Sequence, residues 1–397
     1  MPSDESAEVV IIGAGVNGLS TARALVELGL GDVLVLDRAT AGSGGSGKSS
    51  GIVRCHYGNR SLAAMAWRAL PVLAHAREIL GADSGYHNTG YLVGVGPENL
   101  GALRANVAMH QSLGIDVDLV GHDTAQEMWP WANLADFAAF AYEPHGGYGD
   151  GHQTAQAFSA AARRGGARIR QQSAVVGIEL HGERASGVRL ASGARIASGQ
   201  VVLAAGPWSV PLARSVGIDL PIAAQRAQIL LVDPGISMPH VPVLSDLVSL
   251  QYVRAEGSTS VLLGDSDHAT PEWADPDHYR ERASEEELIR MIPKFEHRFP
   301  GLGAARLSSS YAGCYDVTPD YNPVISASSV DGVWLCAGFS GHGYKISPSV
   351  GELMADLITS GRSRHPDVDH NDFRWERFAA GDHLVSPHPY TGAGQMR

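Results

Sequence analysis

The chain has 397 residues, of which 44% are hydrophobic and 18% are charged; this is ordinary for a globular protein and long enough that we expect two domains. The formal net charge of −12 argues against nucleic acids and acidic membrane surfaces as partners, and the widely spaced Cys55, Cys314 and Cys336 form neither a disulfide framework nor a zinc site. The acidic N-terminus has no signal-type apolar core and no apolar run is long enough to span a bilayer, so we expect a soluble, cytoplasmic protein with no bound metal.

The first predicted elements are a strand, a glycine-rich turn, a helix and a second strand. Two continuous apolar runs, VVII and VLVL, predict strands buried on both faces, and GAGVNG with an amphipathic helical pattern lies between them. Gly13 suits the tight turn, Gly15 the close approach of backbone to a pyrophosphate, and Gly18 the packing of the helix on the strand. Asp37 follows the second strand, where a ribose hydroxyl would be accepted. This context predicts a dinucleotide site with phosphates at the helix N-terminus.

The rest of the chain alternates between helical and strand patterns. Helices are predicted over residues 61–80, 103–113, 124–131 and 154–164, and strands over residues 86–95, 174–180, 187–190, 195–197 and 201–205. Between residues 221 and 312 the pattern becomes antiparallel, with strands at 229–232, 250–254 and 260–263. A capping box at Ser284 predicts a helix start, and a buried strand at 333–336 precedes a helix with Ser347 as N-cap and Gly361 at its end.

Buried strands of the parallel type therefore occur at the start, in the middle and near the end of the chain, with antiparallel material between them. This order predicts one discontinuous, doubly wound domain formed by residues 1–88, 146–214 and 323–397. The second domain is formed by residues 89–145 and 215–322.

A glycine- and serine-rich stretch at residues 42–49, GSGGSGKS, matches the nucleoside-triphosphate loop pattern letter for letter. That loop must run from a strand directly into a helix whose first turn holds the lysine and serine. Here Lys48 and Ser49 are followed by Gly51-Ile52-Val53, which is a poor helix start. We prefer a loop that passes close to a bulky planar cofactor. An ATP-binding protein and a flexible linker remain alternatives.

Two cationic residues are candidates for holding an anion. Arg54 follows an apolar pair and either lies in an interior pocket or forms a surface ion pair. Lys345 lies beside the start of a helix, where a cation is unfavourable unless an anion accompanies it. That anion is either a substrate carboxylate or a structural Asp or Glu. The glycines of Gly338 to Gly343 put backbone against a flat group.

Other polar and aromatic residues give weaker signals. Tyr252, Arg254, Tyr311, Tyr315 and Asp320 lie in or next to the antiparallel region, where aromatic residues are usually core, although each is a candidate for lining a site. His152 and His268 have polar neighbours in the sequence, so we expect both to lie at the surface.

Five motifs together resemble the FAD-dependent amino-acid and amine oxidase superfamily, which includes D-amino acid oxidase, glycine oxidase, sarcosine oxidase and dimethylglycine dehydrogenase. The motifs are GAGVNG with its downstream Asp, GIVR, AAGPW, YDVTPDYNPVI and GFSGHGYKISPSVGE. They cover nearly the whole chain, and the last is most similar to sarcosine oxidases and their relatives. The resemblance implies a Rossmann-like FAD-binding domain with an inserted antiparallel substrate domain that roofs the flavin.

The resemblance also implies roles for individual residues. Lys345 would bind a substrate carboxylate with Arg54 nearby, and Gly341, His342 and Gly343 would lie beside the flavin ring. The candidate catalytic residues are Lys345, Arg54, His342 and Tyr252. The candidate FAD-binding residues are Gly13, Gly15, Gly18, Asp37, Arg38, Ser46, Lys48, Ser49, Gly51, Gly206, Trp208, Gly313, Gly338, Gly341, His342, Gly343, Tyr344 and Lys345.

Three departures from the family pattern bear on the cofactor and its oxidant. Gly313 stands where sarcosine oxidases carry the cysteine that holds flavin covalently, with Cys314 one place later. Lys48 replaces the attachment histidine of the dimethylglycine dehydrogenase group. These changes favour non-covalent FAD and leave a covalent link open. The oxygen-activating lysine of sarcosine oxidases is replaced near Leu262.

The resemblance implies oxidation of a small amino acid or a secondary or N-methyl amine to an imine. Oxygen is the expected oxidant, giving hydrogen peroxide, and a homo-oligomer is compatible with the sequence. Two alternatives share the fold: an amine dehydrogenase that passes electrons to a carrier protein, and a non-catalytic flavin-binding subunit.

Overall fold

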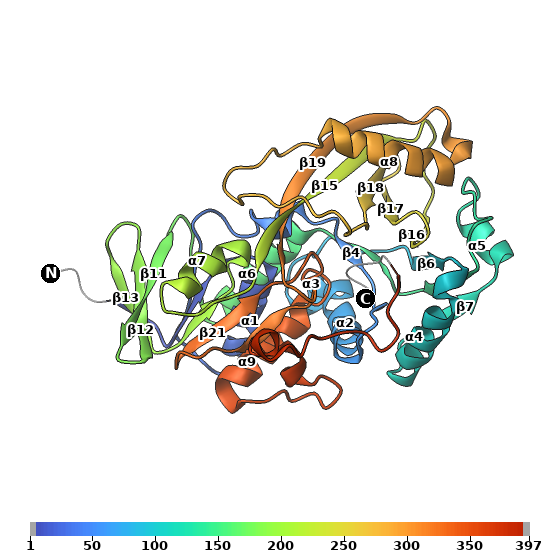
Figure 1. Ribbon diagram of the computed structural model, residues 1–397. Coiled ribbons are helices and arrows are strands. Elements are labelled where there is room, and N and C mark those ends of the chain that lie inside the picture. The colour runs from blue at the N-terminus through green and yellow to red at the C-terminus, as the bar shows by residue number, and fades with distance from the viewer. Residues whose placement is uncertain (1–4, 392–397) are drawn as a thin grey trace.

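The computed structural model describes residues 5–391, and four β-sheets organise this part of the chain (Figure 1). The expected combination of a doubly wound domain and an antiparallel region is confirmed. No helix of the described residues is both long and apolar enough to cross a membrane.

A six-stranded sheet forms the centre of the doubly wound part. Its strands are parallel except β20, which runs antiparallel to β21. In sheet order they are β10 (Arg168–Arg170), β3 (Val33–Leu36), β2 (Val9–Ile12), β14 (Val201–Leu203), β21 (Val333–Ala337) and β20 (Val324–Ala327). The two apolar runs of the sequence become β2 and β3, and every residue in them is buried. Three separate pieces of chain therefore build one sheet, as the sequence predicts.

Helices cover this sheet, and its parallel strands end at one common edge. Helix α1 (Val16–Glu27) packs between α6 (Gly151–Arg164) and α9 (Ser347–Ser360). The carboxyl ends of β2, β3, β14 and β21 all lead into glycine-rich or polar segments at one edge of the sheet. In open α/β sheets this edge is where ligands bind.

An eight-stranded sheet forms the second part of the molecule, at the top and right of Figure 1. Its two longest strands, β15 (Ala223–Asp233) and β19 (Arg306–Val317), pair antiparallel along their length. Helix α8 (Glu285–Arg298) packs against it. The other strands are β18 (Ser260–Asp265), β17 (Gln251–Glu256), β16 (Val243–Asp246), β6 (Tyr91–Val95), β8 (Ala139–Glu143) and β7 (Asp118–Val120). All eight lie within the residue ranges assigned to the second domain.

Two small sheets and the remaining helices complete the described chain. One sheet contains β1 (Glu5–Ser6), β13 (Arg195–Ala197), β12 (Arg184–Leu190) and β11 (Val175–His181); the other contains β4 (Ile52–Val53), β9 (Gly147–Tyr148) and β5 (His87–Asn88). The helices are α2 (Arg60–Ala74), α3 (Ala76–Ile79), α4 (Leu100–Ser112), α5 (His122–Met128), α7 (Ser209–Arg214) and α10 (Arg377–Ala380).

Local signals at helix ends were mostly correct. Ser284 caps α8 by accepting a hydrogen bond from the Glu287 amide at 3.2 Å, and Gly361 ends α9 in the left-handed conformation. Two predictions were wrong in detail. The helix expected over residues 61–80 breaks at His75, whose backbone leaves helical geometry between α2 and α3. Ser347 is the first residue of α9, so Ile346 occupies the cap position.

Candidate active site

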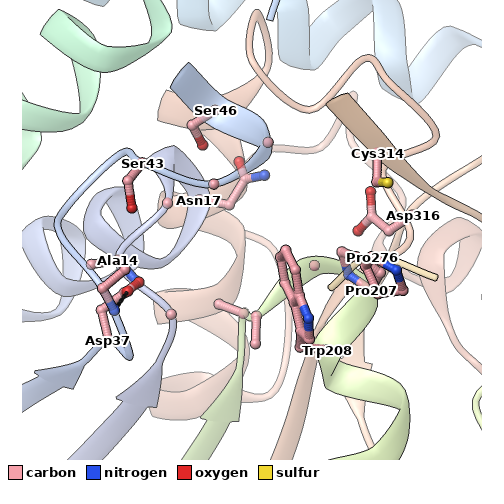
Figure 2. Close-up of a pocket in the computed structure, with 18 of the residues that line it drawn as sticks. Ala14, Asn17, Asp37, Ser43, Ser46, Pro207, Trp208, Pro276, Cys314 and Asp316 are labelled. Atoms are coloured by element: carbon pink, nitrogen blue, oxygen red, sulfur yellow. Dashed lines mark hydrogen bonds between the residues drawn. The ribbon is translucent and has the colours of Figure 1, made fainter. Parts of the chain in front are cut away.

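A large cavity of about 550 Å³ lies at the carboxyl edge of the six-stranded sheet. Figure 2 shows Asp37 and Ala14 on one side of it, Cys314 and Asp316 on the other, and Trp208 between them. The cavity therefore extends from the end of β3 to the end of β19. An elongated ligand would contact both parts of the molecule.

The glycine turn after β2 shapes one end of the large cavity. Gly13 has a φ of +113°, and a Cβ placed there would lie 2.3 Å from the Ala204 carbonyl oxygen. A Cβ on Gly18 would lie 2.1 Å from the Gly13 oxygen. Both positions exclude a side chain. Gly15 is the N-cap of α1 and no side chain caps it, so the positive end of this helix faces the cavity.

Asp37 holds the turn rather than pointing freely into the cavity. Its carboxylate accepts hydrogen bonds from the amides of Ala14 and Ala39, both at 2.7 Å. Ser46 reaches across from the second glycine-rich loop and accepts from the Val16 amide at 3.1 Å. The two glycine-rich loops therefore form one continuous wall.

The loop at residues 42–49 does not have the geometry of a triphosphate loop. Its short 3₁₀ turn (Gly45–Lys48) is followed by Ser49 in an extended conformation and then by β4. A triphosphate loop requires a helix to begin at its lysine and serine. No helix begins at Lys48 or Ser49. Lys48 instead donates to Tyr279 at 2.6 Å and to Glu281 at 2.5 Å.

A segment from the second part of the molecule lies over the large cavity. We call residues 275–281 the covering segment, because Pro276, Asp277, Tyr279 and Glu281 all line the cavity. Two ion pairs join it to the opposite wall: Arg38 to Asp277 at 2.7 Å, and the Lys48 to Glu281 pair described above. The Trp208 indole also donates to Asp277, at 3.0 Å.

The glycine segment after β21 shapes the other end of the large cavity. Gly338, Ser340 and Gly341 all have positive φ values. Asp316 accepts a hydrogen bond from the Gly338 amide at 2.7 Å. Burial raises the pKa of Asp316 to about 6, and the amides that it accepts from, beginning with Gly338, act in the opposite direction. Asp316 lies in the YDVTPDYNPVI motif, and the sequence alone indicates no role for it.

A small cavity of about 40 Å³ adjoins the large one. Tyr315 and Gly341 line both cavities. The small cavity is otherwise surrounded mainly by polar side chains, which are those of Ser50, Arg54, Ser245, Tyr252, Asp265, Ser266, His268 and Lys345. It therefore has room for a small polar molecule at the far end of the large cavity.

Lys345 is the more informative of the two cations in the small cavity. It is 5% exposed, and among residues 5–391 no carboxylate lies within ion-pair distance of its ammonium. Burial, followed by the charge of Arg54, holds the pKa of Lys345 well below its usual range. The structural Asp or Glu considered as its partner is thus not found in the described chain.

Arg54 is buried, so the expected alternative of a surface ion pair is wrong. Its guanidinium donates to the carbonyl oxygen of His56 and lies 4.5 Å from the ring centre of Tyr57. Like Lys345, it forms no ion pair with any carboxylate in the described part of the chain. Two cations therefore face one small cavity without an ion-pair partner in the described chain; the carboxylate of Asp265, which also lines the cavity, pairs with other residues.

The other candidate catalytic residues lie in different surroundings. His342 is fully buried; its ring nitrogens contact the Tyr321 carbonyl at 2.8 Å and the Tyr57 hydroxyl at 3.3 Å, and it lines neither cavity. Burial, followed by the charge of Lys345, lowers the pKa of His342 to about 3. Tyr252 lines the small cavity and pairs with Gly264 on the neighbouring strand. A Cβ added to Gly264 would lie 2.1 Å from the Tyr252 ring.

The candidate cofactor residues separate into two groups. Those that line the large cavity are Gly13, Gly15, Asp37, Arg38, Ser46, Lys48, Ser49, Gly206, Trp208, Gly341, Gly343 and Tyr344. Lys345 lines only the small cavity, and those that line neither cavity are Gly18, Gly51, Gly313, Gly338 and His342.

The sequence interpretation was incomplete around the small cavity. His268 was expected at the surface, which is wrong: it is 9% exposed and lines the small cavity, whereas His152 is exposed as expected. Ser245, Asp265 and Ser266 were not considered. Ser245 lies in β16, whereas Asp265 ends β18 and Ser266 follows it, and no local pattern indicates that the two strands bring them together.

Comparisons with known proteins agree with this geometry. The family model described as FAD dependent oxidoreductase matches residues 8–357. Sarcosine oxidase subunit beta from Arthrobacter sp is 25% identical over 396 residues, which cover 97% of this chain and 94% of that protein. The crystal structure of L-proline dehydrogenase from P. horikoshii has a TM-score of 0.87 and 25% identity, and the match covers 96% of this chain and 99% of that chain.

A further relative is longer than this chain. The 4-methylaminobutanoate oxidase (formaldehyde-forming) from Paenarthrobacter nicotinovorans is 26% identical over 390 residues, which are 95% of this chain. The match covers 46% of that protein, so the chain spans about half of its length.

Proposed function

The chain belongs to the FAD dependent oxidoreductase family, and we propose that it oxidises a small amino acid or a secondary or N-methyl amine that carries a carboxylate. One observation carries this proposal: Lys345 and Arg54 face a small cavity, and neither forms an ion pair with a carboxylate of the described chain. Burying two uncompensated cations is costly, so such an arrangement points to an anionic ligand. Tyr315 and Gly341 join this cavity to the one in which the cofactor would lie.

The residues of the large cavity fit FAD. The N-terminus of α1, whose N-cap Gly15 has no side chain, and the side-chain-free turn at Gly13 to Gly15 suit a pyrophosphate. Asn17 also lines the cavity, and its side-chain oxygen is buried without a partner. The glycines at the opposite end leave space for a planar ring beside the small cavity. Cys314 lines the cavity with a thiol whose pKa burial raises to about 11, so its weak nucleophilicity favours non-covalent FAD.

In the proposed reaction the protein chiefly binds and orients the substrate. Lys345 and Arg54 hold the substrate carboxylate, which fixes the reacting carbon toward the wall formed by Tyr315 and Gly341. The same cations disfavour a positive charge on the substrate nitrogen, so the amine is neutral when it reacts. The start of α9, just after Lys345, favours negative charge at this end of the large cavity. When bound, FAD supplies the acceptor for the hydride that leaves the substrate carbon.

Oxygen is the proposed final oxidant, and an electron carrier is the second candidate. Leu262, near which the resemblance puts the oxygen-activating lysine of sarcosine oxidases, is buried and apolar. That observation, with the similarity to a structure named L-proline dehydrogenase, is the reason to keep a carrier as the second candidate, whereas the similarity to a protein named sarcosine oxidase subunit beta supports oxygen. Hydrogen peroxide formed in equal amount to the substrate consumed would establish an oxidase. Turnover only with an added electron acceptor would establish a dehydrogenase.

The test of the proposed function is anaerobic reduction of the purified protein. We expect yellow protein whose visible flavin absorption is lost on adding a member of a panel of N-methyl and cyclic amino acids. The matched control is the same panel without the carboxyl group, which should reduce the flavin far more slowly. Protein that binds FAD but is reduced by no amine would be a non-catalytic flavin-binding subunit. Protein protected from heat by ATP, with protection lost in Lys48→Ala, would instead support the ATP-binding alternative.

A further inference from the structure

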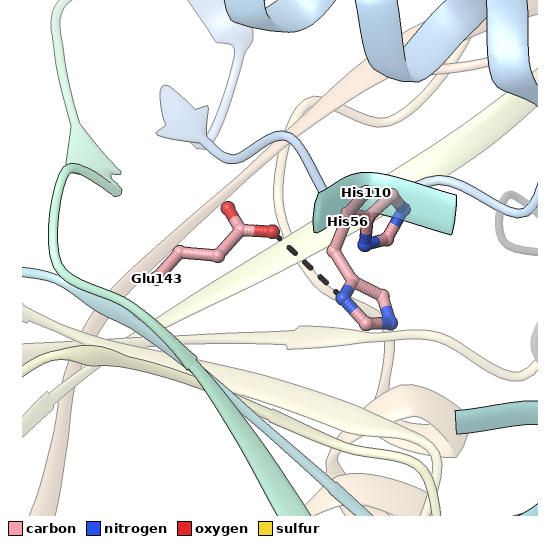
Figure 3. Close-up of side chains that lie close together, drawn as sticks. All are labelled: His56, His110 and Glu143. Carbon is pink, nitrogen blue, oxygen red and sulfur yellow. Dashed lines mark ion pairs between the residues drawn. The ribbon is translucent and has the colours of Figure 1, made fainter. Parts of the chain in front are cut away.

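Three buried titratable side chains lie behind Arg54, and neither cavity includes them. We call His56, His110 and Glu143 the buried triad; Figure 3 shows the three side chains converging. They are 0%, 0% and 3% exposed, and one nitrogen or oxygen atom from each lies within 4.8 Å of the others. His56 follows β4, His110 belongs to α4 and Glu143 ends β8. The fold therefore brings three distant pieces of chain to one point.

One polar atom of each triad member holds a neighbouring group in place. Glu143 accepts a hydrogen bond from the Cys55 amide at 2.8 Å, and the His110 ring contacts the Tyr57 carbonyl at 2.7 Å. The His56 ring contacts the Tyr390 hydroxyl at 2.8 Å, and the guanidinium of Arg54 donates to the backbone carbonyl of His56. The triad thus fastens the backbone just after Arg54, which limits where the guanidinium can lie.

The other polar atom of each triad member is buried without a hydrogen-bond partner. These atoms are His56 Nδ1, His110 Nδ1 and Glu143 Oε1. His56 Nδ1 and Glu143 Oε1 lie 3.8 Å apart. Buried acceptors that lack a donor are unfavourable. A proton bound by the triad would give one of these acceptors a donor. The triad therefore favours its protonated form more than an exposed carboxyl group does.

A divalent metal ion would also satisfy these atoms, but the charges argue against it. Glu143 is the only anionic member of the triad, and the positive charge of Arg54 acts on Glu143, His56 and His110 alike. A second positive centre placed beside a buried guanidinium would be repelled. The triad is better suited to hold a proton than a metal.

We propose that Glu143 is a positioning residue for Arg54, and that its ionisation sets how strongly Arg54 and Lys345 attract a carboxylate in the small cavity. This inference rests on the proposed function, in which these two cations anchor the substrate. Ionised Glu143 offsets the charge of Arg54 and weakens anion binding. Protonated Glu143 leaves the two cations at full strength.

The groups that face Glu143 allow this effect to be isolated. Burial raises the pKa of Glu143 to about 7, with the Cys55 amide and then Arg54 acting in the opposite direction. Burial lowers the pKa of both triad histidines, so they stay neutral near pH 7. Burial raises the pKa of the other facing groups, so they also stay neutral; these are Cys55, Tyr57, Tyr91 and Tyr390. Lys345 is the other group whose titration would change anion binding with pH, because its own pKa is lowered.

The experiment measures acetate binding to the oxidised holoenzyme through the change in visible flavin absorption. For the wild type, we expect the acetate dissociation constant to rise by about threefold or more between about pH 6 and pH 8.5. Glu143→Gln keeps an acceptor for the Cys55 amide and removes the charge. It should bind acetate at both pH values as tightly as the wild type does at the lower one.

The matched control is Glu287→Gln. Glu287 is also 3% exposed and its pKa is also raised by burial, but it lies on α8 and hydrogen-bonds Arg290. This variant should keep the pH dependence of the wild type. A general effect of removing a buried carboxylate would change both variants.

Four results would overturn the inference. A wild-type dissociation constant that does not change with pH would do so without any variant, and therefore decides the question even if Glu143→Gln fails to fold. A pH dependence that persists in Glu143→Gln would assign it to Lys345. A stoichiometric metal in the purified holoenzyme, lost in His110→Ala, would make the triad a metal site. Acetate that binds at no pH would overturn the carboxylate anchor of the proposed function as well.

Discussion

Lys345 combines a cost to the fold with a role in the proposed reaction. Its ammonium is buried and, within residues 5–391, forms no ion pair with a carboxylate. A buried charge of this kind destabilises the native state unless something compensates it. Residues that serve a ligand are often those whose replacement stabilises the folded chain.

Lys345→Met should therefore separate stability from activity. We expect a rise in KM of about 10- to 100-fold for an amino-acid substrate, because one charged hydrogen bond to the carboxylate is lost. We also expect the free energy of unfolding to increase by about 1–3 kcal/mol, because an uncompensated charge is replaced by an apolar chain of similar length. Steady-state kinetics and thermal unfolding check the two parts. Unchanged KM, or a variant less stable than the wild type, would contradict this role.

The raised pKa of Glu143 predicts that the stability of the fold depends on pH. The sign of this dependence follows from the direction of the pKa shift. Burial raises the pKa of Glu143 from 4.5 to about 7. Its contribution to stability is therefore fully present below about pH 4.5 and is lost as the pH rises through about 7, because the unfolded chain then releases its proton more readily. Glu143→Gln removes this loss.

The expected result is that Glu143→Gln and the wild type have similar stability near pH 5. Near pH 8.5 the variant should be more stable by up to about 3 kcal/mol. Chemical unfolding at the two pH values measures the difference. If the difference in stability between the variant and the wild type is the same at both pH values, Glu143 does not titrate between them.

At the scale of single elements, the glycine turn and its helix were predictable and the small cavity was not. Gly13, Gly15 and Gly18 are close together in the sequence, and each serves a steric need that only glycine meets. His268 and Asp265, by contrast, reach the small cavity because β17 and β18 pair antiparallel and place their ends beside Lys345. Such a meeting depends on sheet register, which a local sequence pattern does not contain.

Two glycines, each in the first turn of its helix, test the steric reading of the turn: Gly18 is buried and Gly101 is exposed. In Gly18→Ala the new Cβ would lie 2.1 Å from the Gly13 oxygen, so we expect loss of bound FAD and a lower melting temperature. In Gly101→Ala the Cβ of α4 meets nothing within 4 Å. That control should keep FAD and gain about 0.5–1 kcal/mol from its higher helix propensity. Equal FAD content in the two variants would show that the turn tolerates a side chain.

At the scale of the whole molecule, three pieces of chain must come together before the large cavity exists. The order of buried strands in the sequence was enough to predict this, since apolar runs without alternation indicate strands covered on both faces. The sequence did not indicate that the covering segment folds back over the cavity. That segment has neither regular structure nor a motif, and it is placed by the ion pairs to Arg38 and Lys48.

The covering segment has a consequence for how long the cofactor stays bound. A dinucleotide in the large cavity would contact residues 275–281, because four of them line it, so we expect this segment to hinder its release. The ion pairs that hold the segment are largely exposed, with Arg38 and Asp277 at 47% and 45%. Exposed pairs weaken as ionic strength rises. Salt should therefore shorten the residence time of FAD.

Asp277→Asn isolates this effect, because the amide oxygen can still accept from Trp208 while the charge opposite Arg38 is lost. We expect FAD to dissociate about two- to fivefold faster than from the wild type at low salt, and the difference to shrink at high salt. The control, Asp83→Asn, breaks an exposed pair with Arg77 that is remote from the cavity. The rate is measured by trapping released FAD with an excess of another apoflavoprotein. If the two variants release FAD at the same rate, escape of the cofactor is limited by contacts deeper in the cavity.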